Sequence, residues 1–367
     1  MSLIRSTLAA VQSGRLRTPL ASALRYLLVP LSLIYRMTVA VRNLLYRSNV
    51  LESKLCPGKV ISIGNITTGG TGKTPVTLML ANWLKSRDLP FAVLSRGYQS
   101  PSEKGSLVFN SSVPVSNNVV GDEIALLARK LPDTWFGVGQ NRMHNIKTLQ
   151  ERQDIGIFLL DDGFQHRQLL RDYDIVLVDA CNPFGNGWLL PAGNLREPLS
   201  SLARADLILI TRAESHTPAE LSALKEKLRK YVNVKRIFEV RTTISRLYDL
   251  ATREPVELNE LSQRKCAAFC GIGNPDSFTQ LLIANGITVN QSIVFDDHHC
   301  YSETDLVLLR SMLTDGSCDL LLTTEKDAVK LPRDGFARGS CAVVEISVAV
   351  AEREDIFWGK IAEVLAC

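Results

Sequence analysis

The stretch GGTGKTP, residues 69–75, places three glycines, a lysine and two threonines three residues after the apolar run VISIGN. Glycines let backbone N–H groups turn inward around phosphate oxygens. A lysine can then bridge the β and γ phosphates, while a threonine hydroxyl at a helix start ligates Mg²⁺. The motif and its context predict a nucleotide-binding loop made of Thr67, Thr68, Gly69, Gly70, Thr71, Gly72, Lys73 and Thr74. The alternative is a glycine-rich turn with a chance lysine.

The loop departs from the common form G-x-x-x-x-G-K-[ST], because Thr67 stands where that form has its first glycine. The string TGGTGKT resembles the variant loop of ATPases that read K-G-G-x-G-K-T, with Thr68 in place of their signature lysine. The later stretch TTEKDAVK does not spell the guanine-reading pattern N-K-x-D. We therefore expect ATP as the nucleotide.

Carboxylates and imidazoles supply the other candidate chemistry. Asp161 and Asp162 end an apolar run, where a nucleotide-binding fold holds its second Mg²⁺ contact. The alternative there is a strand-end turn, since Asp-Gly is a common turn pair. Asp122 begins a helical pattern, where aspartate is also a favoured cap. The string FDDHHCYS, residues 295–302, suits proton handling or metal binding, or it is a polar loop.

Predicted strands and helices, which must position these residues, alternate along the chain. Short buried-type strands are expected at 60–65, 91–98, 135–139, 155–163, 174–180 and 206–212, with helical patterns between several of them. The alternation predicts an α/β fold of the P-loop NTPase type: a mostly parallel sheet with helices on both faces, in two lobes. We expect an arm at 1–52, a nucleotide-binding lobe at 53–215, a hinge or linker at 216–260 and a C-terminal α/β lobe at 261–367.

The bulk composition is that of an ordinary globular protein, with 46% hydrophobic and 22% charged residues among 367. Eight scattered cysteines form no disulfide or zinc framework, which fits a reducing compartment. The net charge is +4, but residues 1–51 hold seven arginines with no lysine and no acid. The basic character therefore belongs to the arm and not to the body, and we expect no nucleic-acid partner.

The arm is apolar as well as basic. Its longest uncharged run, Tyr26–Tyr35, has ten residues, whereas a spanning helix needs about 20. At about 100° per residue, Arg25, Arg36 and Arg47 fall within roughly 40° of one another on a helix. This pattern favours a helix lying in a membrane interface with its guanidinium groups at anionic head groups. The alternatives are a helix packed on the body, or a signal peptide or true span.

Seven strings taken together, GNITTGGTGKTP, SRGY, GDE, LDDGFQHRQLLRD, LLPAGNLREP, FDDHHCYS and TTEKDAVKL, resemble the tetraacyldisaccharide 4′-kinase family of lipid A biosynthesis. The resemblance runs in order from about residue 20 to about residue 331. It implies transfer of the γ-phosphoryl group of ATP to the 4′-hydroxyl of a tetraacylated glucosamine disaccharide 1-phosphate. It also implies a peripheral location on the cytoplasmic face of the bacterial inner membrane.

Roles follow from the same resemblance. Asp122 matches the acid that takes the proton from the sugar hydroxyl, and His298 matches its partner histidine. His298 is preferred to His299 because it directly follows Asp297. The predicted Mg²⁺ ligands are Thr74, Asp161, Asp162 and Glu197. Charge alone suggests that Arg96 and Arg196 contact the phosphate of the acceptor.

Two alternatives come from other classes of protein. One is a membrane-positioning ATPase switch of the same loop class, which hydrolyses ATP without phosphorylating a lipid. The other is a non-catalytic lipid-binding protein with a vestigial nucleotide site. The loop pair Lys73–Thr74 and the acids Asp161 and Asp162 argue against the second.

Overall fold

The computed structural model describes residues 12, 19–98, 100–261 and 263–366, without the side chains of 19–25. The predictions that rest on Arg5, Arg15 and Arg17, and on the side chain of Arg25, lie outside the described residues. The chain divides into two compact units, each built from separate stretches of sequence. Unit 1 comprises Met1–Pro114, Leu131–Arg241 and Ala349–Cys367, and unit 2 comprises Val115–Lys130 and Thr242–Val348.

The two units are not continuous in sequence, whereas the expected lobes at 53–215 and 261–367 are. Residues 115–130 group with the second unit, and residues 349–367 group with the first. The expected linker at 216–260 contains helix α7 (Pro218–Leu228) and the long strand β8 (Ile237–Asp249), and the division between the units falls within β8. Side-chain packing explains the C-terminal segment: Trp358 of helix α12 (Glu354–Ala366) stacks on Trp83 with ring centroids 5.0 Å apart.

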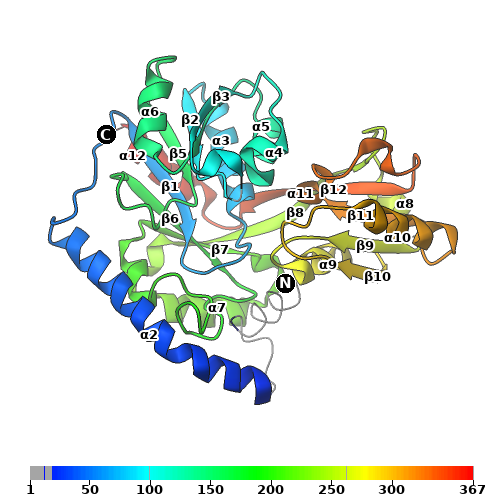
Figure 1. Ribbon diagram of the computed structural model, residues 1–367, viewed down its shortest axis with the longest axis horizontal. Coiled ribbons are helices and arrows are strands. Elements are labelled where there is room, and N and C mark those ends of the chain that lie inside the picture. Colours follow the sequence, from blue (N-terminus) through cyan, green and yellow to red (C-terminus); the bar gives the residue numbers. More distant parts are fainter. Residues whose placement is uncertain (1–11, 13–18, 99, 262, 367) are drawn as a thin grey trace. The chain divides into compact units, whose positions relative to one another are not determined.

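The sheet of unit 1 is mostly parallel, as predicted (Figure 1). Its strand order is β8-β7-β6-β1-β5-β2-β4-β3, and only the edge pair β3–β4 is antiparallel among the pairs described. The central strands are buried on both faces, which explains their continuous apolar sequences. The strand bounds are β1 Lys59–Asn65, β2 Phe91–Ser95, β3 Ser106–Asn110, β4 Trp135–Gly139, β5 Ile157–Asp161, β6 Tyr173–Asp179 and β7 Leu207–Thr211.

Helices cover both faces of this sheet. Helix α6 (Arg142–Gln150) and helix α7 pack on the face formed by Phe158, Leu160 and Val176. Helix α3 (Lys73–Lys85) and helix α12 pack on the other face, where Thr77 of α3 reaches Asp161. The sheet therefore presents the ends of β1 and β5 next to the start of α3, which is where the predicted phosphate site lies.

Helix α2 (Pro19–Arg47) is a continuous helix of 29 residues that runs through Pro30. Its length is about 44 Å at 1.5 Å per residue. Figure 1 shows it along one side of unit 1. One stripe is fixed to the body, where the Ser32 hydroxyl donates to the carbonyl of Leu189 at 2.7 Å and Val39 is buried. Within residues 26–47, most of the other side chains are exposed.

Unit 2 contains a parallel sheet with strand order β10-β9-β11-β12, continued by β8. Apolar clusters line its two faces, one with Leu306 and Leu309 of α10 and the other with Phe278 and Leu282 of α9. The bounds are α4 Asn117–Val120, α5 Asp122–Lys130, α8 Leu258–Leu261, β9 Cys266–Cys270, α9 Pro275–Ala284, β10 Val289–Val294, α10 Glu303–Thr314, β11 Leu320–Thr324, α11 Glu325–Ala328 and β12 Cys341–Val350.

Candidate active site

The phosphate loop, residues 67–74, joins β1 to α3, so the strand–loop–helix context that the motif requires is present. Gly69 and Gly72 have φ values of 105° and 85°, which other residues adopt only under strain. Gly72 caps α3 without a side-chain hydrogen bond, and the first turn of α3 carries no acid among these described residues. The N–H groups at the start of α3 therefore form a ready site for an anion.

Three polar side chains that were not among the predicted site residues hold the loop. The Asn65 amide donates to the Thr71 hydroxyl at 2.9 Å, and the Thr211 hydroxyl donates to the Thr71 carbonyl at 3.0 Å. Arg212 donates to the carbonyl of Gly70 at 2.7 Å and pairs with Asp179. Thr211 ends β7 and Arg212 follows it, and the carboxyl ends of parallel strands are where ligands of such sheets bind. The position of Thr211 and Arg212 at the carboxyl end of a strand could therefore have identified both as candidate site residues from the sequence.

Asp162 is the charged centre of the phosphate site. Lys73 Nζ lies 3.4 Å from its Oδ1, and Arg196 Nη1 lies 3.1 and 3.0 Å from its two oxygens. Burial alone would raise the pKa of this carboxyl, but Lys73 and Arg196 outweigh burial and hold the pKa well below its usual range. Asp162 also has a left-handed backbone, with φ 53°. It is therefore an ionised group that holds Lys73 and Arg196 in place.

Asp161 and Thr74 are the residues best suited to a divalent cation. Asp161 ends β5 and is 1% exposed, with the Thr77 hydroxyl donating to its Oδ1 at 3.2 Å. Thr74 lies in the first turn of α3, directly after Lys73. Hydroxyl and carboxylate oxygens are the ligands that Mg²⁺ takes, usually one or two of them with several waters. The described residues contain no cluster of three or more acidic, His or Cys side chains arranged to hold a metal.

Arg142 lies within electrostatic reach of Asp161 and Asp162, and Arg96 lies within reach of Arg142. Arg96 is half exposed and pairs with Glu103 at 2.7 Å. Arg142, at the start of α6, is 4% exposed and did not appear among the predicted site residues. Burial, with help from Arg96, lowers the pKa of Arg142 to about 10, against the pull of Asp162 and Asp161. Burial, together with the positive charges of Arg142, Arg171 and Arg96, lowers the pKa of His166 to about 4, so His166 is neutral near pH 7.

Glu197 lies in a different environment from the acid pair. Its carboxylate is fully buried and accepts from Arg204 at 2.9 Å and from Asn43 at 3.2 Å. Arg42 lies 3.5 Å from its other oxygen. Asn43 and Arg42 belong to α2, and the Tyr35 hydroxyl of the same helix donates to the Arg196 carbonyl at 3.0 Å. Arg196 and Glu197 thus connect α2 to the phosphate site.

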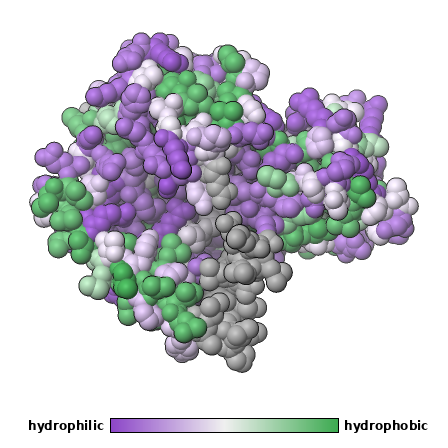
Figure 2. Space-filling view, viewed as in Figure 1, coloured by the Kyte–Doolittle hydropathy of each residue, from purple (hydrophilic) through white to green (hydrophobic). Residues whose placement is uncertain are grey.

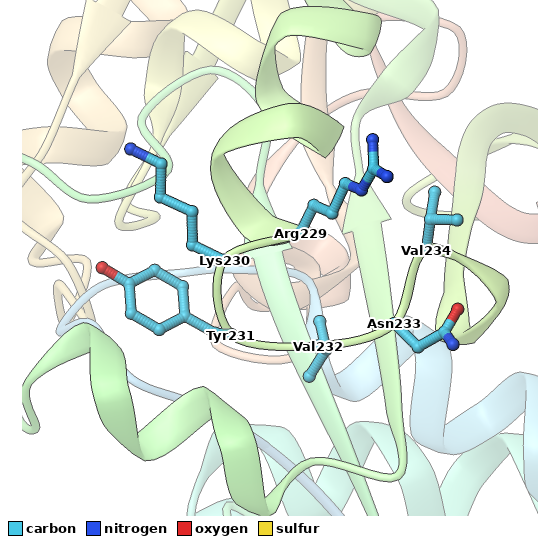
Figure 3. A pocket seen from close by; sticks show the side chains of 6 residues that line it. All are labelled: Arg229, Lys230, Tyr231, Val232, Asn233 and Val234. Carbon is cyan, nitrogen blue, oxygen red and sulfur yellow. The ribbon is translucent and has the colours of Figure 1, made fainter.

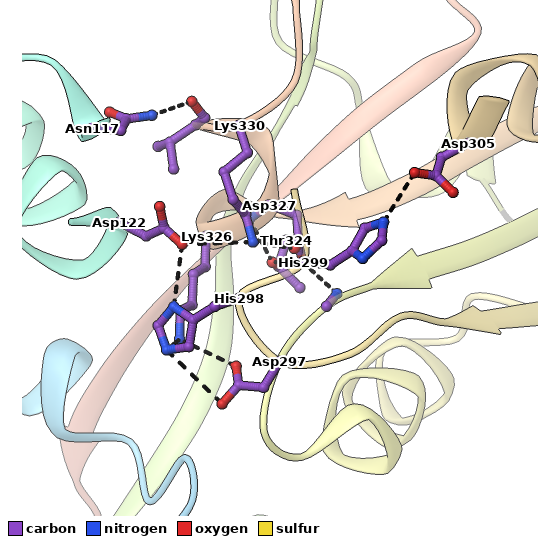
Figure 4. A network of polar contacts seen from close by, with 12 residues as sticks. Asn117, Asp122, Asp297, His298, His299, Asp305, Thr324, Lys326, Asp327 and Lys330 are labelled. Atoms are coloured by element: carbon purple, nitrogen blue, oxygen red, sulfur yellow. Dashed lines mark hydrogen bonds and ion pairs between the residues drawn. The ribbon is translucent and has the colours of Figure 1, made fainter. Parts of the chain in front are cut away.

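In unit 2 the structure brings Asp122 and His298 together (Figure 4). Asp122 begins α5, and His298 Nδ1 lies 3.3 Å from its Oδ2. His298 has a left-handed backbone with φ 62°. His299 pairs instead with Asp305, Nε2 to Oδ2, at 3.0 Å. The geometry therefore agrees with the preference for His298 over His299.

Two lysines of the TTEKDAVK string surround this pair. Lys330 Nζ lies 3.7 Å from Asp122 and 3.2 Å from Asp327. Lys326 Nζ lies 3.4 Å from His298 Nε2 and 3.3 Å from Glu123. Burial would raise the pKa of Asp122, but His298 and the lysines lower it below its ordinary value. The sequence analysis used this string only as one of the strings that resemble the kinase family, and it predicted no role for either lysine.

A surface pocket of about 440 Å³ lies elsewhere in unit 1, after α7 (Figure 3). Six consecutive residues line it: Arg229, Lys230, Tyr231, Val232, Asn233 and Val234. None of the predicted site residues is among them. The pocket is therefore not part of the candidate active site.

The glycine loop between a strand of a mostly parallel sheet and a helix, with Lys73 beside a carboxylate, defines a P-loop protein of the nucleotide-binding class. The model of the tetraacyldisaccharide-1-P 4′-kinase family matches residues 24–366. The chain belongs to this family.

Relatives of known name agree with that assignment. Tetraacyldisaccharide 4′-kinase of Halothermothrix orenii is 38% identical over 325 residues, 85% of this chain and 84% of that protein. The enzyme of the same name from Pelobacter propionicus is 36% identical over 326 residues, 88% of this chain and 87% of that protein. The crystal structure of LpxK from Aquifex aeolicus in complex with ATP matches with a TM-score of 0.73 and 32% identity, covering 93% of this chain and 99% of that chain.

Proposed function

We propose that this protein is an ATP-dependent lipid kinase. It transfers the γ-phosphoryl group of ATP to the 4′-hydroxyl of a tetraacylated glucosamine disaccharide 1-phosphate and forms the bis-phosphorylated lipid A precursor. The match of the family model to residues 24–366, over an intact phosphate loop, is the observation that carries this proposal. The relatives that support it are named tetraacyldisaccharide 4′-kinases.

Unit 1 supplies the nucleotide site. The N–H groups at the start of α3 and the ammonium of Lys73 face the phosphates, and Asp162 fixes that ammonium together with Arg196. Phosphoryl transfer involves little covalent chemistry by the protein, so positioning and charge neutralisation carry most of the rate. Arg96 and Arg196 remain candidates for the phosphate of the acceptor, although each already pairs with an acid.

Mg²⁺ is the second cofactor that we propose. When bound, it neutralises charge on the transferring phosphate. Thr74 and Asp161 fit as its ligands on the geometry given above. Asp162 and Glu197, the other two predicted ligands, already accept from cations, so we assign them lower priority. Calorimetry of MgATP binding to an Asp161→Asn variant, compared with ATP in the presence of a chelator, tests this assignment.

Unit 2 supplies the proton chemistry. Asp122 accepts the proton of the attacking hydroxyl, and His298 holds the carboxylate through Nδ1. A carboxylate with a lowered pKa is a weak base. A loose transition state requires mainly that the hydroxyl is oriented and that its proton has an acceptor late in the reaction. The pair is suited to that task.

Helix α2 is the proposed membrane contact. Among the described residues, Tyr26–Arg47 is the one segment long and apolar enough to cross a membrane, with mean hydropathy 1.3, and this is weak evidence by itself. Its exposed apolar side chains are stronger evidence: Leu27 is 75% exposed, Met37 68% and Leu44 61%. Figure 2 shows hydrophobic surface along the side where Figure 1 draws α2. A four-chain lipid stays in the bilayer, so we place the enzyme at the interface, on the cytoplasmic face of the inner membrane.

Vesicle sedimentation tests this contact. Deleting residues 1–50 should release the protein from anionic phospholipid vesicles. The double variant Met37→Asp, Leu44→Asp should weaken binding by at least about tenfold, because burying one such side chain is worth about 1.5–3 kcal/mol. Val307→Asp on α10, at a side chain 56% exposed, is the matched control. Unchanged sedimentation of both α2 variants would count against the proposal.

The central test is a phosphate-transfer assay. The protein, Mg²⁺ and γ-labelled ATP are incubated with detergent-dispersed tetraacyl disaccharide 1-phosphate, and label in the lipid fraction is counted. We expect label on the lipid. Label released only as free phosphate would instead support the ATPase switch, the second candidate function, which the family match makes the weaker one.

A further inference from the structure

Lys326 lies where it can control the protonation of His298. It belongs to α11, and its Nζ is 3.4 Å from His298 Nε2 (Figure 4). The same ammonium is 3.3 Å from Glu123 and 3.5 Å from Asp297. All of these residues belong to unit 2. We propose that Lys326 is a positioning residue that fixes the His298 imidazole as the neutral tautomer with its proton on Nδ1.

The chemistry of the donors and acceptors carries this inference. An ammonium group has three donors and no acceptor, so His298 Nε2 must present its lone pair to Lys326. A neutral imidazole has one N–H, which must then be on Nδ1. Nδ1 faces Oδ2 of Asp122 at 3.3 Å, and an ionised carboxylate only accepts. The two contacts therefore select the same tautomer, with Nδ1–H donating to Asp122.

The charges around the pair keep Lys326 protonated. Burial would lower the pKa of Lys326, but Glu123 and Asp297 outweigh burial and raise it above its ordinary value. Asp297 is not a competing acceptor for an Nε2 proton, because its Oδ2 lies 4.0 Å from Nε2, beyond hydrogen-bond distance. Lys330, 3.7 Å from Asp122, is the second cation at the pair.

Without Lys326, His298 would face the carboxylates Asp122 and Asp297, both of which favour the imidazolium form. An imidazolium beside Asp122 would make that carboxylate a still weaker proton acceptor. Lys326 opposes this charging, because a like charge disfavours the protonated ring. It also occupies Nε2, so the proton of the acceptor hydroxyl passes to Asp122 and not to the ring. This last consequence rests on the proposed function; the tautomer does not.

The test is NMR of full-length protein labelled with ¹⁵N-histidine. The chain has five histidines, and a His298→Gln sample identifies the signal of His298. We expect a protonated Nδ1 and an unprotonated Nε2 at pH 7.5. An Nε2–H tautomer or an imidazolium at this pH in the wild-type protein would overturn the proposal, and this measurement needs no variant of Lys326.

Variants sharpen the test. In Lys326→Met the imidazolium and Nε2–H forms of His298 should replace part of the Nδ1–H signal at pH 7.5, and Lys326→Arg, which keeps a cationic donor, should restore most of the wild-type signal. Lys330→Met removes the other cation and should leave the Nδ1–H tautomer in place. An unchanged Nδ1–H signal of His298 in Lys326→Met would contradict the proposal.

Kinetics give an independent readout. For Lys326→Met we expect kcat to fall about tenfold at pH 7, with the KM for ATP unchanged and the acidic limb of the kcat profile moved to higher pH. A uniform loss at all pH values would show a merely structural role. If no phosphate reaches the lipid with wild-type protein, the proposed function fails while the NMR result still decides the tautomer.

Discussion

The phosphate loop of unit 1 and the Asp122–His298 pair of unit 2 are built in opposite ways. The loop is one contiguous stretch between β1 and α3, whereas Asp122 and His298 are 176 positions apart in sequence. Both hold an ionised carboxylate next to lysine side chains, Asp162 beside Lys73 and Asp122 beside Lys330. Both also place a non-glycine residue, Asp162 or His298, in the left-handed region.

In the proposed reaction the two regions have different tasks. We propose that the loop binds the nucleotide through backbone groups and one lysine, so this binding depends mainly on the local conformation of the loop. The pair depends on the packing of α5, α11 and the loop that carries His298. Loss of the first should therefore affect ATP binding and turnover together, and loss of the second should affect turnover alone.

The largest expected effect is that of Lys73→Ala. Removing a cation from the transferring phosphate should lower kcat by about 10³-fold, near the upper end for one stabilising donor, and should weaken ATP binding. Phosphate transfer to the lipid and calorimetric ATP titration measure the two effects. Lys85→Ala, at the exposed end of the same helix, is the matched control. Wild-type turnover in Lys73→Ala would remove the loop from the mechanism.

Asp122→Ala tests the proposed role of the Asp122–His298 pair. Turnover should fall by about 10²-fold or more, the usual span for a general base, with the Kd for ATP kept. The matched control is Asp305→Ala, which breaks the second acid–imidazole pair of unit 2. That variant loses a capping box and should cost about 1 kcal/mol of stability, with turnover close to wild type. Near-normal turnover in Asp122→Ala would contradict the proposed role.

The same comparison explains what the sequence could predict. Lys73, Thr74 and the acids of the DDG string were predictable because the motif and its strand–helix context are local. The mostly parallel sheet followed from alternating apolar runs. Arg142 gave no local signal, because its proximity to the acid pair depends on how α6 packs on the sheet.

Candidate site residues that contact residues far away in the sequence were predicted only in part. His298 was found through a resemblance, and neither periodicity nor spacing would have selected it over His299. Lys326 and Lys330 lay in a quoted string without a role, since their convergence on His298 and Asp122 depends on α11 packing beside α5. Glu197 was predicted as a metal ligand from its motif, and no sequence pattern showed that Arg42 and Asn43 of α2 would surround it.

Glu197→Gln tests whether Glu197 fixes α2 to the phosphate site. The variant leaves Arg42 and Arg204 without their buried counter-charge, so unfolding should become easier by about 2 kcal/mol. Because Arg196 is the next residue and holds Asp162, we also expect a moderate loss of ATP affinity. Chemical denaturation and ATP titration measure the two. Full stability in this variant would mean that Glu197 does not fix α2 to the phosphate site.

The smallest effect is a pH dependence in unit 2. Glu325 and Glu345 both contact Lys130 at the end of α5, at 2.8 and 2.6 Å. Burial, opposed by Lys130 and helped by Glu345, raises the pKa of Glu325 to about 7. A carboxyl with a raised folded-state pKa binds its proton more tightly in the folded protein, so its contribution is present at low pH and is lost as pH rises through about 7.

Between pH 6 and pH 8 this one group should therefore lower the free energy of unfolding by about 1 kcal/mol. In Glu325→Gln that decline should disappear, since the amide does not titrate. Denaturant unfolding of both proteins at the two pH values measures the difference, with Glu260→Gln, at an exposed position of α8, as control. Because α5 carries Asp122 at its other end, a parallel change in kcat would show that docking of this helix sets the geometry of the pair. An equal decline in wild type and Glu325→Gln would mean that Lys130 keeps Glu325 ionised throughout this range.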